Sequence, residues 1–295
     1  MQIARTLAEL QTASAALRAR FEHTALVPTM GALHAGHRAL VSAAVATGAG
    51  VAASIFVNPT QFAALEDLSR YPRDEPGDLA ALRAAGCHLV WLPTVETMYP
   101  PGDATTIELT GPARRWEGAA RPGHFRGVAT ICARLFGQVR PDAAFFGEKD
   151  WQQLQVIRRM VVDLLLPLEI VGVATVREPD GLAMSSRNRF LSAPERATAP
   201  LLYAEMKTAA TALEQGGPAD PVLLQTRHGL AAAGFGVEYL ALVDGPSLDP
   251  LAVSRPPARL IAAARLGSVR LLDNLAINGS GGSRGDQNPE IRQSG

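Results

Sequence analysis

The chain has 295 residues, of which 47% are hydrophobic and 19% charged, and its formal net charge at pH 7 is zero. This composition is typical of a globular protein with a sizeable core, and the zero net charge argues against a nucleic acid or an anionic membrane as partner. Two cysteines, Cys87 and Cys132, lie far apart among apolar residues, which favours buried free thiols in a reducing compartment. We therefore expect a cytoplasmic protein.

The N-terminal segment carries charges throughout and lacks the apolar stretch of a signal peptide. Residues 39–57 are uncharged and long enough to span a bilayer, but Gly48 and Gly50 interrupt them. A helix followed by a strand is the better interpretation of this stretch.

Short apolar strands alternate with helical stretches up to about residue 176. Strands are predicted at residues 24–28, 51–58, 88–92, 143–146 and 169–173, and helices at 38–47, 78–85, 128–139 and 151–165. Because buried strands separated by helices form parallel sheets, we expect residues 1–176 to form an α/β domain with helices on both faces of the sheet. Ligands of such sheets bind beyond the carboxyl ends of the strands.

The pattern changes after residue 176. A capping box at Ser192 and Glu195 predicts one long helix through Leu213. A second helix at 221–233 and strands at 237–243, 259–263 and 269–273 follow, and the last two strands are joined by a hairpin turn. Residues 177–278 are thus predicted to form a smaller α+β domain, and the polar, glycine-rich residues 279–295 a disordered tail.

The first candidate site is the stretch VPTMGALHAGHRALVSAA, residues 27–44. Gly31 allows a tight turn that places His34 and His37 in the first turn of the next helix, where unpaired backbone N–H groups attract an anion. Two imidazoles three residues apart lie on one helix face and can contact the same phosphate. Gly36 lets a ligand approach the backbone closely. The alternative is a pair of surface histidines at a helix start.

A second candidate site is FFGEKDWQQLQVI, residues 145–157. Only two of the 28 basic residues are lysines, Lys149 and Lys207. A lysine in so arginine-rich a chain suggests a place where a compact ammonium suits a phosphate better than a planar guanidinium. Gln153 is expected on the inner side of the following turn. The alternative is a solvated charged loop.

Three further stretches carry polar groups. Ser185, Ser186 and Arg187 offer two hydroxyls and a guanidinium for phosphate oxygens, although taken alone they are better interpreted as capping the next helix. Asn58 and Gln61 follow a strand end, where neutral amides suit a small polar substrate. Residues 114–128 are basic with aromatic residues among them, which is compatible with RNA contact or with a loop over an anionic site.

Several catalytic motifs are absent from the sequence. There is no nucleophile elbow, no cysteine near a plausible base, no metal-ligand spacing, no Walker A loop and no Gly-x-Gly-x-x-Gly motif after a strand. The remaining groups grip phosphate without supplying a nucleophile. Such a set favours displacement at phosphorus by the substrate itself.

Six motifs in order closely resemble the pantoate–β-alanine ligase family of the nucleotidyltransferase superfamily. They are PTMGALHAGH, FVNPTQF, YPRD, RPGHFRGVAT, RPDAAFFGEKDWQQL and DGLAMSSRNRFL. The resemblance covers residues 24–192 well and extends more loosely through YLALVD and LLDN. Trp151 departs from it, since the family usually has Tyr or Phe there. The rivals are a dinucleotide-forming member of the superfamily, which would lack the paired glutamines, and a non-catalytic nucleotide or RNA binder.

The resemblance implies a Rossmann-like, doubly wound parallel sheet of the nucleotidyltransferase type. It also implies that pantoate attacks the α-phosphorus of Mg²⁺-bound ATP, and that β-alanine then attacks the resulting pantoyl adenylate and releases AMP. A homodimer is expected by the same resemblance. The sequence identifies no Mg²⁺ ligands.

The resemblance also carries residue roles, with catalysis assigned to His37, His34 and Lys149. Gln61 and Gln153 are assigned to pantoate, and Gln61 also to β-alanine. The residues assigned to ATP are Met30, Gly31, His34, His37, Gly147, Glu148, Lys149, Asp150, Val176, Met184, Ser185, Ser186 and Arg187.

Overall fold

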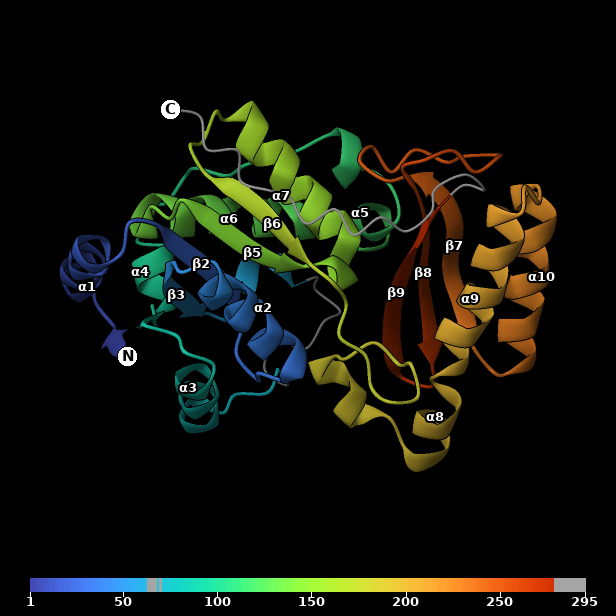
Figure 1. Ribbon diagram of the computed structural model, residues 1–295, viewed down its shortest axis with the longest axis horizontal. Coiled ribbons are helices and arrows are strands. Elements are labelled where there is room, and N and C mark those ends of the chain that lie inside the picture. Colours follow the sequence, from blue (N-terminus) through green and yellow to red (C-terminus); the bar gives the residue numbers. More distant parts are fainter. Residues whose placement is uncertain (63–67, 69–70, 279–295) are drawn as a thin grey trace.

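A six-stranded parallel sheet occupies the N-terminal part of the computed structural model, which describes residues 1–62, 68 and 71–278. The strand order is β1-β4-β3-β2-β5-β6 (Figure 1). The strands are β1 (Gln2–Ala4), β2 (Thr24–Thr29), β3 (Gly50–Ile55), β4 (Leu89–Trp91), β5 (Ala143–Gly147) and β6 (Glu169–Val173). The five predicted strands of this sheet are confirmed, and β1 is an additional short edge strand. The predicted tail lies outside the described residues.

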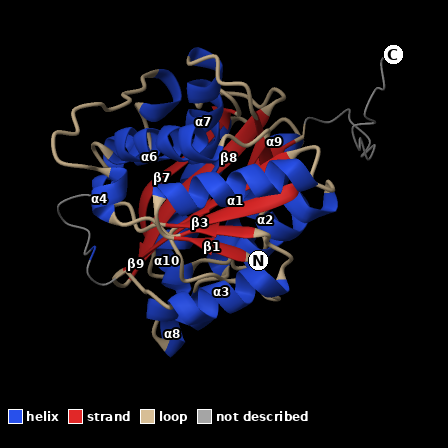
Figure 2. Cartoon of the chain, turned by 90° about the vertical axis from the view of Figure 1, so that its left-hand side faces the viewer, coloured by secondary structure: helices blue, strands red, loops and turns tan. Residues whose placement is uncertain are grey.

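Helices cover both faces of this sheet, as predicted. In β2, Leu26 packs into one core with α1 (Leu7–Arg20), α6 (His124–Val139) and α7 (Trp151–Asp163). Ala25 and Val27 face the opposite way, toward α2 (Ala35–Ala46) and α3 (Glu75–Ala84). This alternation follows from the two-residue period of a strand, and it makes β2 apolar on both sides. Figure 2 shows α6 and α7 on one side of the sheet and α3 on the other.

The smaller C-terminal domain contains a three-stranded antiparallel sheet, β7 (Gly236–Asp244), β8 (Ala258–Leu266) and β9 (Val269–Ile277). The predicted hairpin between β8 and β9 is confirmed. Helices α9 (Leu201–Glu214) and α10 (Ala219–Ala232) pack on this sheet and share a core with it. This core is separate from the two cores of the parallel sheet.

The single long helix predicted from Ser192 to Leu213 is wrong. The capping box at Ser192 is present, but it opens the short α8 (Ala193–Thr198), and α9 begins only after Pro200. Proline has no N–H to donate, and its ring clashes with the carbonyl one turn earlier, so a continuous helix cannot pass through Pro200.

Two tryptophans connect the N-terminal part of the chain to the C-terminal sheet. Trp116 donates its indole N–H to the carbonyl of Leu248 at 3.0 Å, and Trp151 donates to the carbonyl of Gly245 at 2.8 Å. Both rings pack with Tyr239 against the inner face of β7 and β8. The antiparallel sheet is thereby fixed against the start of α7, close to the carboxyl end of β5.

The predicted helix-and-strand interpretation of residues 39–57 is confirmed, since α2 and β3 occupy that stretch. Over the described residues, every helix is too short or too polar to cross a bilayer.

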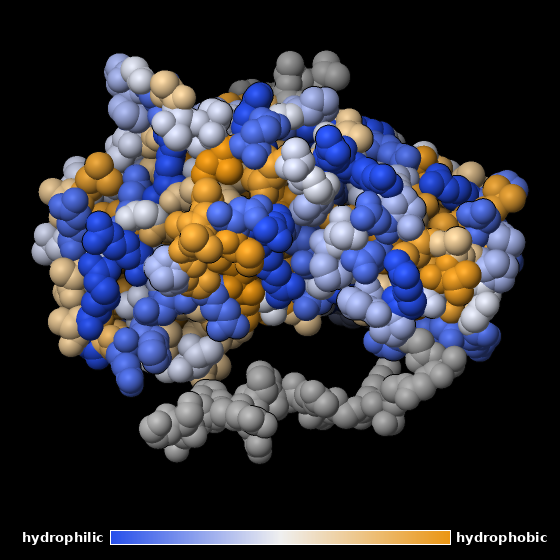
Figure 3. Space-filling view, turned by 90° about the horizontal axis from the view of Figure 1, so that it is seen from above, coloured by the Kyte–Doolittle hydropathy of each residue, from blue (hydrophilic) through white to orange (hydrophobic). Residues whose placement is uncertain are grey.

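Three apolar side chains at the end of α7, Val162, Leu164 and Leu165, are exposed. Figure 3, which views the molecule from above, shows apolar areas interspersed with charged ones on that face.

Candidate functional site

A cavity opens at the carboxyl ends of β2 and β5, which pair in parallel at the centre of the sheet. From β2 the chain proceeds outward through β3 and β4 and then crosses to β5, so the strand order reverses between these two strands. Such a reversal point is where open α/β sheets bind ligands. Residues of the C-terminal sheet, including Tyr239, Ile261 and Asn274, complete the wall.

Most of the predicted site residues meet in this cavity. The ones in its wall are Met30, His34, His37, Gln61, Gly147, Lys149, Asp150, Gln153, Val176, Met184, Ser185, Ser186 and Arg187. Two predicted ATP-binding residues, Gly31 and Glu148, are not part of it. Gly31 has a left-handed φ of 82°, and a Cβ there would lie 2.8 Å from Asp78, so its role is conformational. Glu148 instead forms an ion pair with Arg259.

His34 and His37 form a capping box at the start of α2. Nδ1 of His34 accepts from the N–H of Gly36 at 3.1 Å, and Nδ1 of His37 accepts from the N–H of His34 at 3.3 Å. A neutral imidazole that accepts at Nδ1 carries its proton at Nε2. Both rings, whose centroids are 4.2 Å apart, therefore have an N–H left to offer a ligand.

Several backbone N–H groups at and before the start of α2 have partners within the protein, which reduces the number available to an anion. The carboxylate of Asp78 accepts from the N–H groups of Ala32 and Leu33 at 2.9 and 2.7 Å, and the N–H groups of His34 and Gly36 donate to the imidazoles. The donors available to an anion here are thus mainly the imidazole Nε2–H groups rather than these backbone N–H groups.

Burial keeps both histidines neutral at physiological pH. Desolvation, reinforced by the nearby Lys149 ammonium, lowers the pKa of His34 to about 4. Desolvation and the neighbouring His34 lower the pKa of His37 to about 3. These side chains are consequently neutral hydrogen-bond donors rather than acids.

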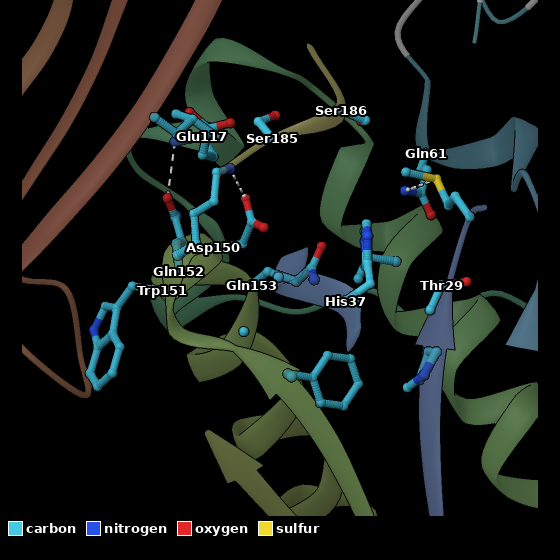
Figure 4. A pocket seen from close by; sticks show the side chains of 18 of the residues that line it. Thr29, His37, Gln61, Glu117, Asp150, Trp151, Gln152, Gln153, Ser185 and Ser186 are labelled. Atoms are coloured by element: carbon cyan, nitrogen blue, oxygen red, sulfur yellow. Dashed lines mark hydrogen bonds and ion pairs between the residues drawn. The ribbon is translucent and has the colours of Figure 1, made fainter. Parts of the chain in front are cut away.

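Lys149 supplies a cation on the β5 side of the cavity. It lies in the turn η4 (Glu148–Asp150), which directly follows β5, and only 17% of its side chain is exposed. Its Nζ is 3.5 Å from Oδ1 of Asp150 (Figure 4). Burial raises the pKa of the Asp150 carboxyl, but Lys149 and Arg187 outweigh this effect and lower it below the usual value. The cluster of Lys149, Asp150 and Arg187 retains an excess positive charge.

Ser185 and Ser186 lie across the cavity from the sheet (Figure 4). Oγ of Ser185 accepts from the N–H of Arg187 at 3.3 Å and caps the turn η5 (Ser186–Phe190), so the capping interpretation is confirmed. A hydroxyl that accepts one hydrogen bond can still donate its own proton. Capping and ligand binding are therefore compatible at Ser185.

A fixed amide orients Gln61, which lies in the turn η1 (Pro59–Gln61). Asn58 is 1% exposed; its Oδ1 accepts from Thr60 and Tyr99, and its Nδ2 donates to Oε1 of Gln61 at 3.0 Å. The Nε2 group of Gln61 therefore points toward the cavity, where its contact is the sulfur of Met30 at 3.1 Å. Gln61 can donate to a hydroxyl or carboxylate oxygen of a ligand.

Several residues of the wall had no assigned role, among them Glu117, Arg121, His124, Tyr239 and Asn274. The signals that could have found them are the motifs RPGHFRGVAT, YLALVD and LLDN, which contain four of the five. Glu117 forms an ion pair with Arg270, and Tyr239 donates to it at 2.8 Å.

The structure does not support RNA binding by residues 114–128. Trp116 packs against Tyr239 and donates to Leu248, and Phe125 is buried, so neither aromatic side chain is available to stack on a base. Arg121 and His124 of the same stretch face the cavity instead.

A protein-held metal does not fit the site. Among residues 1–62, 68 and 71–278, no group of three or more His, Cys, Asp or Glu side chains could hold an ion. The carboxylates nearest the cavity are engaged: Asp78 with backbone N–H groups, Asp150 with Lys149, Asp273 with Arg177 and Glu117 with Arg270. Cys87 and Cys132 are buried free thiols, as predicted.

The fold and the cavity together define a nucleotide-binding α/β protein of the Rossmann-like class. The model of the pantoate-beta-alanine ligase family matches residues 2–276, and the chain belongs to this family.

Known proteins similar to the chain are named pantothenate synthetase or pantoate-beta-alanine ligase. It is 60% identical over 277 residues to a pantothenate synthetase of Granulibacter bethesdensis, covering 93% of this chain and 96% of that protein. The crystal structure of pantothenate synthetase from Thermus thermophilus matches with a TM-score of 0.89 and 49% identity, over 94% of this chain and 99% of the other. The pantoate-beta-alanine ligase of Francisella tularensis, complexed with beta-gamma ATP and beta-alanine, matches with a TM-score of 0.80 and 30% identity, over 94% and 97%.

Gly127 of α6 should be needed to hold Gln61 in place. A Cβ at this position would lie 2.5 Å from the carbonyl oxygen of Thr60 and 2.7 Å from Cα of Gln61. We expect Gly127→Ala to lower the free energy of unfolding by about 1–3 kcal/mol, because backbone must move to admit the methyl group. Urea denaturation measures this change.

Gly137 of the same helix is the matched control. A Cβ there would meet no described atom within 4 Å outside its own helix, so Gly137→Ala should stabilise the protein by about 0.5–1 kcal/mol. Equal unfolding free energies for the two variants would contradict the close approach of α6 and η1.

Proposed function

We propose that the protein condenses pantoate with β-alanine at the expense of ATP, through a pantoyl adenylate. The observation that supports this most is the convergence of three separate phosphate-binding stretches, around His37, Lys149 and Ser185–Arg187, on one cavity that also contains two glutamines. Membership of the pantoate-beta-alanine ligase family gives the substrates.

In the first step a carboxylate oxygen of pantoate attacks the α-phosphorus of ATP, and the bond to pyrophosphate breaks. The protein provides charge neutralisation and position, which are what phosphoryl-type transfer mainly requires. Nε2–H groups of His34 and His37 donate to phosphate oxygens, and Lys149 and Arg187 neutralise the triphosphate. Ser185 and Ser186, which line the same cavity, also donate.

In the second step the amine of β-alanine attacks the activated carbonyl carbon. The C–O bond to the phosphate breaks, AMP leaves with the former carboxylate oxygen, and the nitrogen loses a proton as the amide forms. No side chain acts as a nucleophile in either step, in keeping with the lack of a nucleophile motif. Both reactants are held in one enclosed place, which raises their effective concentration.

Gln61 and Gln153 recognise pantoate, and Gln61 also meets β-alanine. The amide of Gln61 is oriented by Asn58, so its N–H donors are set before the substrate arrives. An analogue without the matching oxygen would leave a buried amide unsatisfied and bind poorly. Phe56, Val128 and Ile131 in the same wall suit the hydrocarbon part of pantoate.

Replacing Gln153 with alanine should raise the KM for pantoate by roughly 10- to 100-fold, the effect of one lost hydrogen bond to a buried polar group. The KM for ATP serves as the internal control and should change by no more than about twofold. Initial rates of AMP formation at varied pantoate and varied ATP measure both constants. An equal rise in the two KM values would remove Gln153 from pantoate binding.

We propose that Mg²⁺ would be bound by the phosphates of ATP, because the described carboxylates do not form a metal site. The homodimer is carried over from the family resemblance, whereas the proposed cytoplasmic location is supported by the two buried free thiols. Sedimentation equilibrium of the purified protein tests the dimer.

The assay that tests the proposed function follows AMP formation with each substrate omitted in turn. AMP should accumulate with turnover only when ATP, pantoate and β-alanine are all present. Without β-alanine, about one equivalent of pyrophosphate per active site should form and the reaction should then stop. A protein that binds ATP yet forms no AMP with all three substrates would be a binder and not a ligase.

A further inference from the structure

One side chain of the C-terminal sheet holds the turn that contains Lys149. Asn274 of β9 is 4% exposed, and its Nδ2 donates to the carbonyl oxygens of both Glu148 and Lys149 at 2.9 Å. These carbonyls belong to η4, the short turn between β5 and α7. The backbone on both sides of the Lys149 Cα atom is thus tied to a strand about 125 residues further along the chain.

Arg259 of β8 fixes the orientation of that amide. Its Nε donates to Oδ1 of Asn274 at 2.6 Å, which leaves Nδ2 directed at the two carbonyls. Its Nη2 donates to Oε2 of Glu148 at 2.8 Å, and its guanidinium lies 3.4 Å from the ring centroid of Trp151. Arg259 and Asn274 therefore contact Glu148, Lys149 and Trp151, three of the four residues that follow β5.

The neighbouring residue of β9 holds a second segment of the cavity wall. Asp273, also 4% exposed, accepts two hydrogen bonds from the guanidinium of Arg177, at 2.7 and 2.8 Å. Arg177 begins the segment that folds back through Ala183 and leads to Ser185–Arg187. Two consecutive side chains of β9 thereby contact two of the three proposed phosphate-binding stretches, the one around Lys149 and the segment that leads to Ser185–Arg187.

We propose that Asn274 is a positioning residue for adenylation, which acts through Lys149 and makes the phosphate site dependent on the C-terminal domain. This inference rests on the proposed function, because it requires that Lys149 neutralises the phosphates of ATP. Asn274 itself touches no phosphate in this account. Without its two hydrogen bonds, η4 loses the contacts that set the lysine relative to the His34 and His37 side of the cavity.

The test compares Asn274→Ala and Asn274→Asp with the wild type in single-turnover release of pyrophosphate. Aspartate has the same shape but places an oxygen against two carbonyl oxygens. Both variants should release pyrophosphate roughly 10- to 100-fold more slowly, the effect of a displacement of about 1 Å at a reacting group. Asn278, exposed just beyond β9, is the matched control, and Asn278→Ala should retain the wild-type rate.

Folding is checked by thermal denaturation of each variant, and the isosteric aspartate variant carries the test if the alanine variant does not fold. A folded Asn274→Asp protein that adenylates at the wild-type rate would overturn the inference.

A double-mutant cycle distinguishes action through Lys149 from a general structural effect. In the Lys149→Ala background, Asn274→Ala should slow pyrophosphate release by no more than about twofold further, because the group it positions is already gone. Fully multiplicative losses would show that Asn274 acts elsewhere. If Lys149→Ala alone leaves the rate unchanged, the proposed function of the lysine fails, which is a different outcome from the failure of Asn274.

Discussion

Replacing Lys149 with alanine should slow pyrophosphate release in a single turnover by roughly 100- to 1,000-fold. The ammonium is mostly buried in the turn after β5, on the wall of the cavity that the Ser185–Arg187 segment also lines. Charge stabilisation by a preorganised group in such an enclosed site has an effect of this size on the reaction barrier. Stopped-flow detection of pyrophosphate, with ATP and pantoate but without β-alanine, measures the rate.

Two other lysine variants test whether the shape of the cation matters and whether the effect is specific to Lys149. Lys149→Arg should remain strongly impaired, because the planar guanidinium cannot take the place of the ammonium 3.5 Å from Asp150. Lys207→Ala is the control, since Lys207 is exposed on α9 and packs near Tyr203. A wild-type rate for Lys149→Arg would refute the point-charge interpretation of this lysine, and a wild-type rate for Lys149→Ala would refute its role altogether.

Replacing His37 with alanine should also slow adenylation by about 100-fold or more, while the fold is retained. The change removes the Nε2–H donor from the cavity. It also removes the acceptor for the N–H of His34, so His34 should lose its fixed orientation. Single-turnover pyrophosphate release gives the rate, and circular dichroism checks the fold.

His37→Gln distinguishes a hydrogen-bond donor from an acid. Burial lowers the pKa of His37 to about 3, so a neutral amide that places an N–H near the former Nε2 position should recover part of the rate lost in His37→Ala. If the glutamine and alanine variants are equally slow, and the wild-type rate falls as pH rises through 6 to 7, His37 would be acting as a proton donor instead.

The fold was largely predictable because its signals are local. Short apolar runs separated by helical periods mark β2 to β6, and their order in the chain implies parallel pairing. Two features escaped prediction. The edge strand β1 has only three residues, too few for a pattern, and in α1 the polar residues Gln11, Thr12 and Ser14 interrupt the apolar ones, which weakens the helical pattern. The break at Pro200 was readable from the sequence, since a proline within a helical pattern ends the helix at the preceding residues.

The site was predictable only where its residues lie in continuous motifs. His37, Lys149 and Ser185 belong to three such motifs, and the cavity brings all three together. The contacts that orient them depend on tertiary structure. Asn274 lies about 125 residues from Lys149, and Asp78 lies 46 residues from the backbone N–H of Ala32 that it binds. Neither pairing leaves a spacing signal in one sequence, and the second one reduces the number of backbone N–H groups available to an anion.

Lysine scarcity was an informative but incomplete signal. It singled out two positions, of which Lys149 lies in the cavity wall and Lys207 on the outer surface of α9. Position at the carboxyl end of a central strand distinguishes the two.

The transfer of one oxygen atom is the most direct measure of whether the bound acid, and not the protein, attacks ATP. Pantoate labelled with ¹⁸O in its carboxylate would be converted with ATP and β-alanine, and the products would be analysed by mass spectrometry. Attack at the α-phosphorus predicts one ¹⁸O atom in each AMP and none in pyrophosphate. Unlabelled AMP, or label in pyrophosphate or inorganic phosphate, would contradict the adenylate route and the interpretation of this cavity.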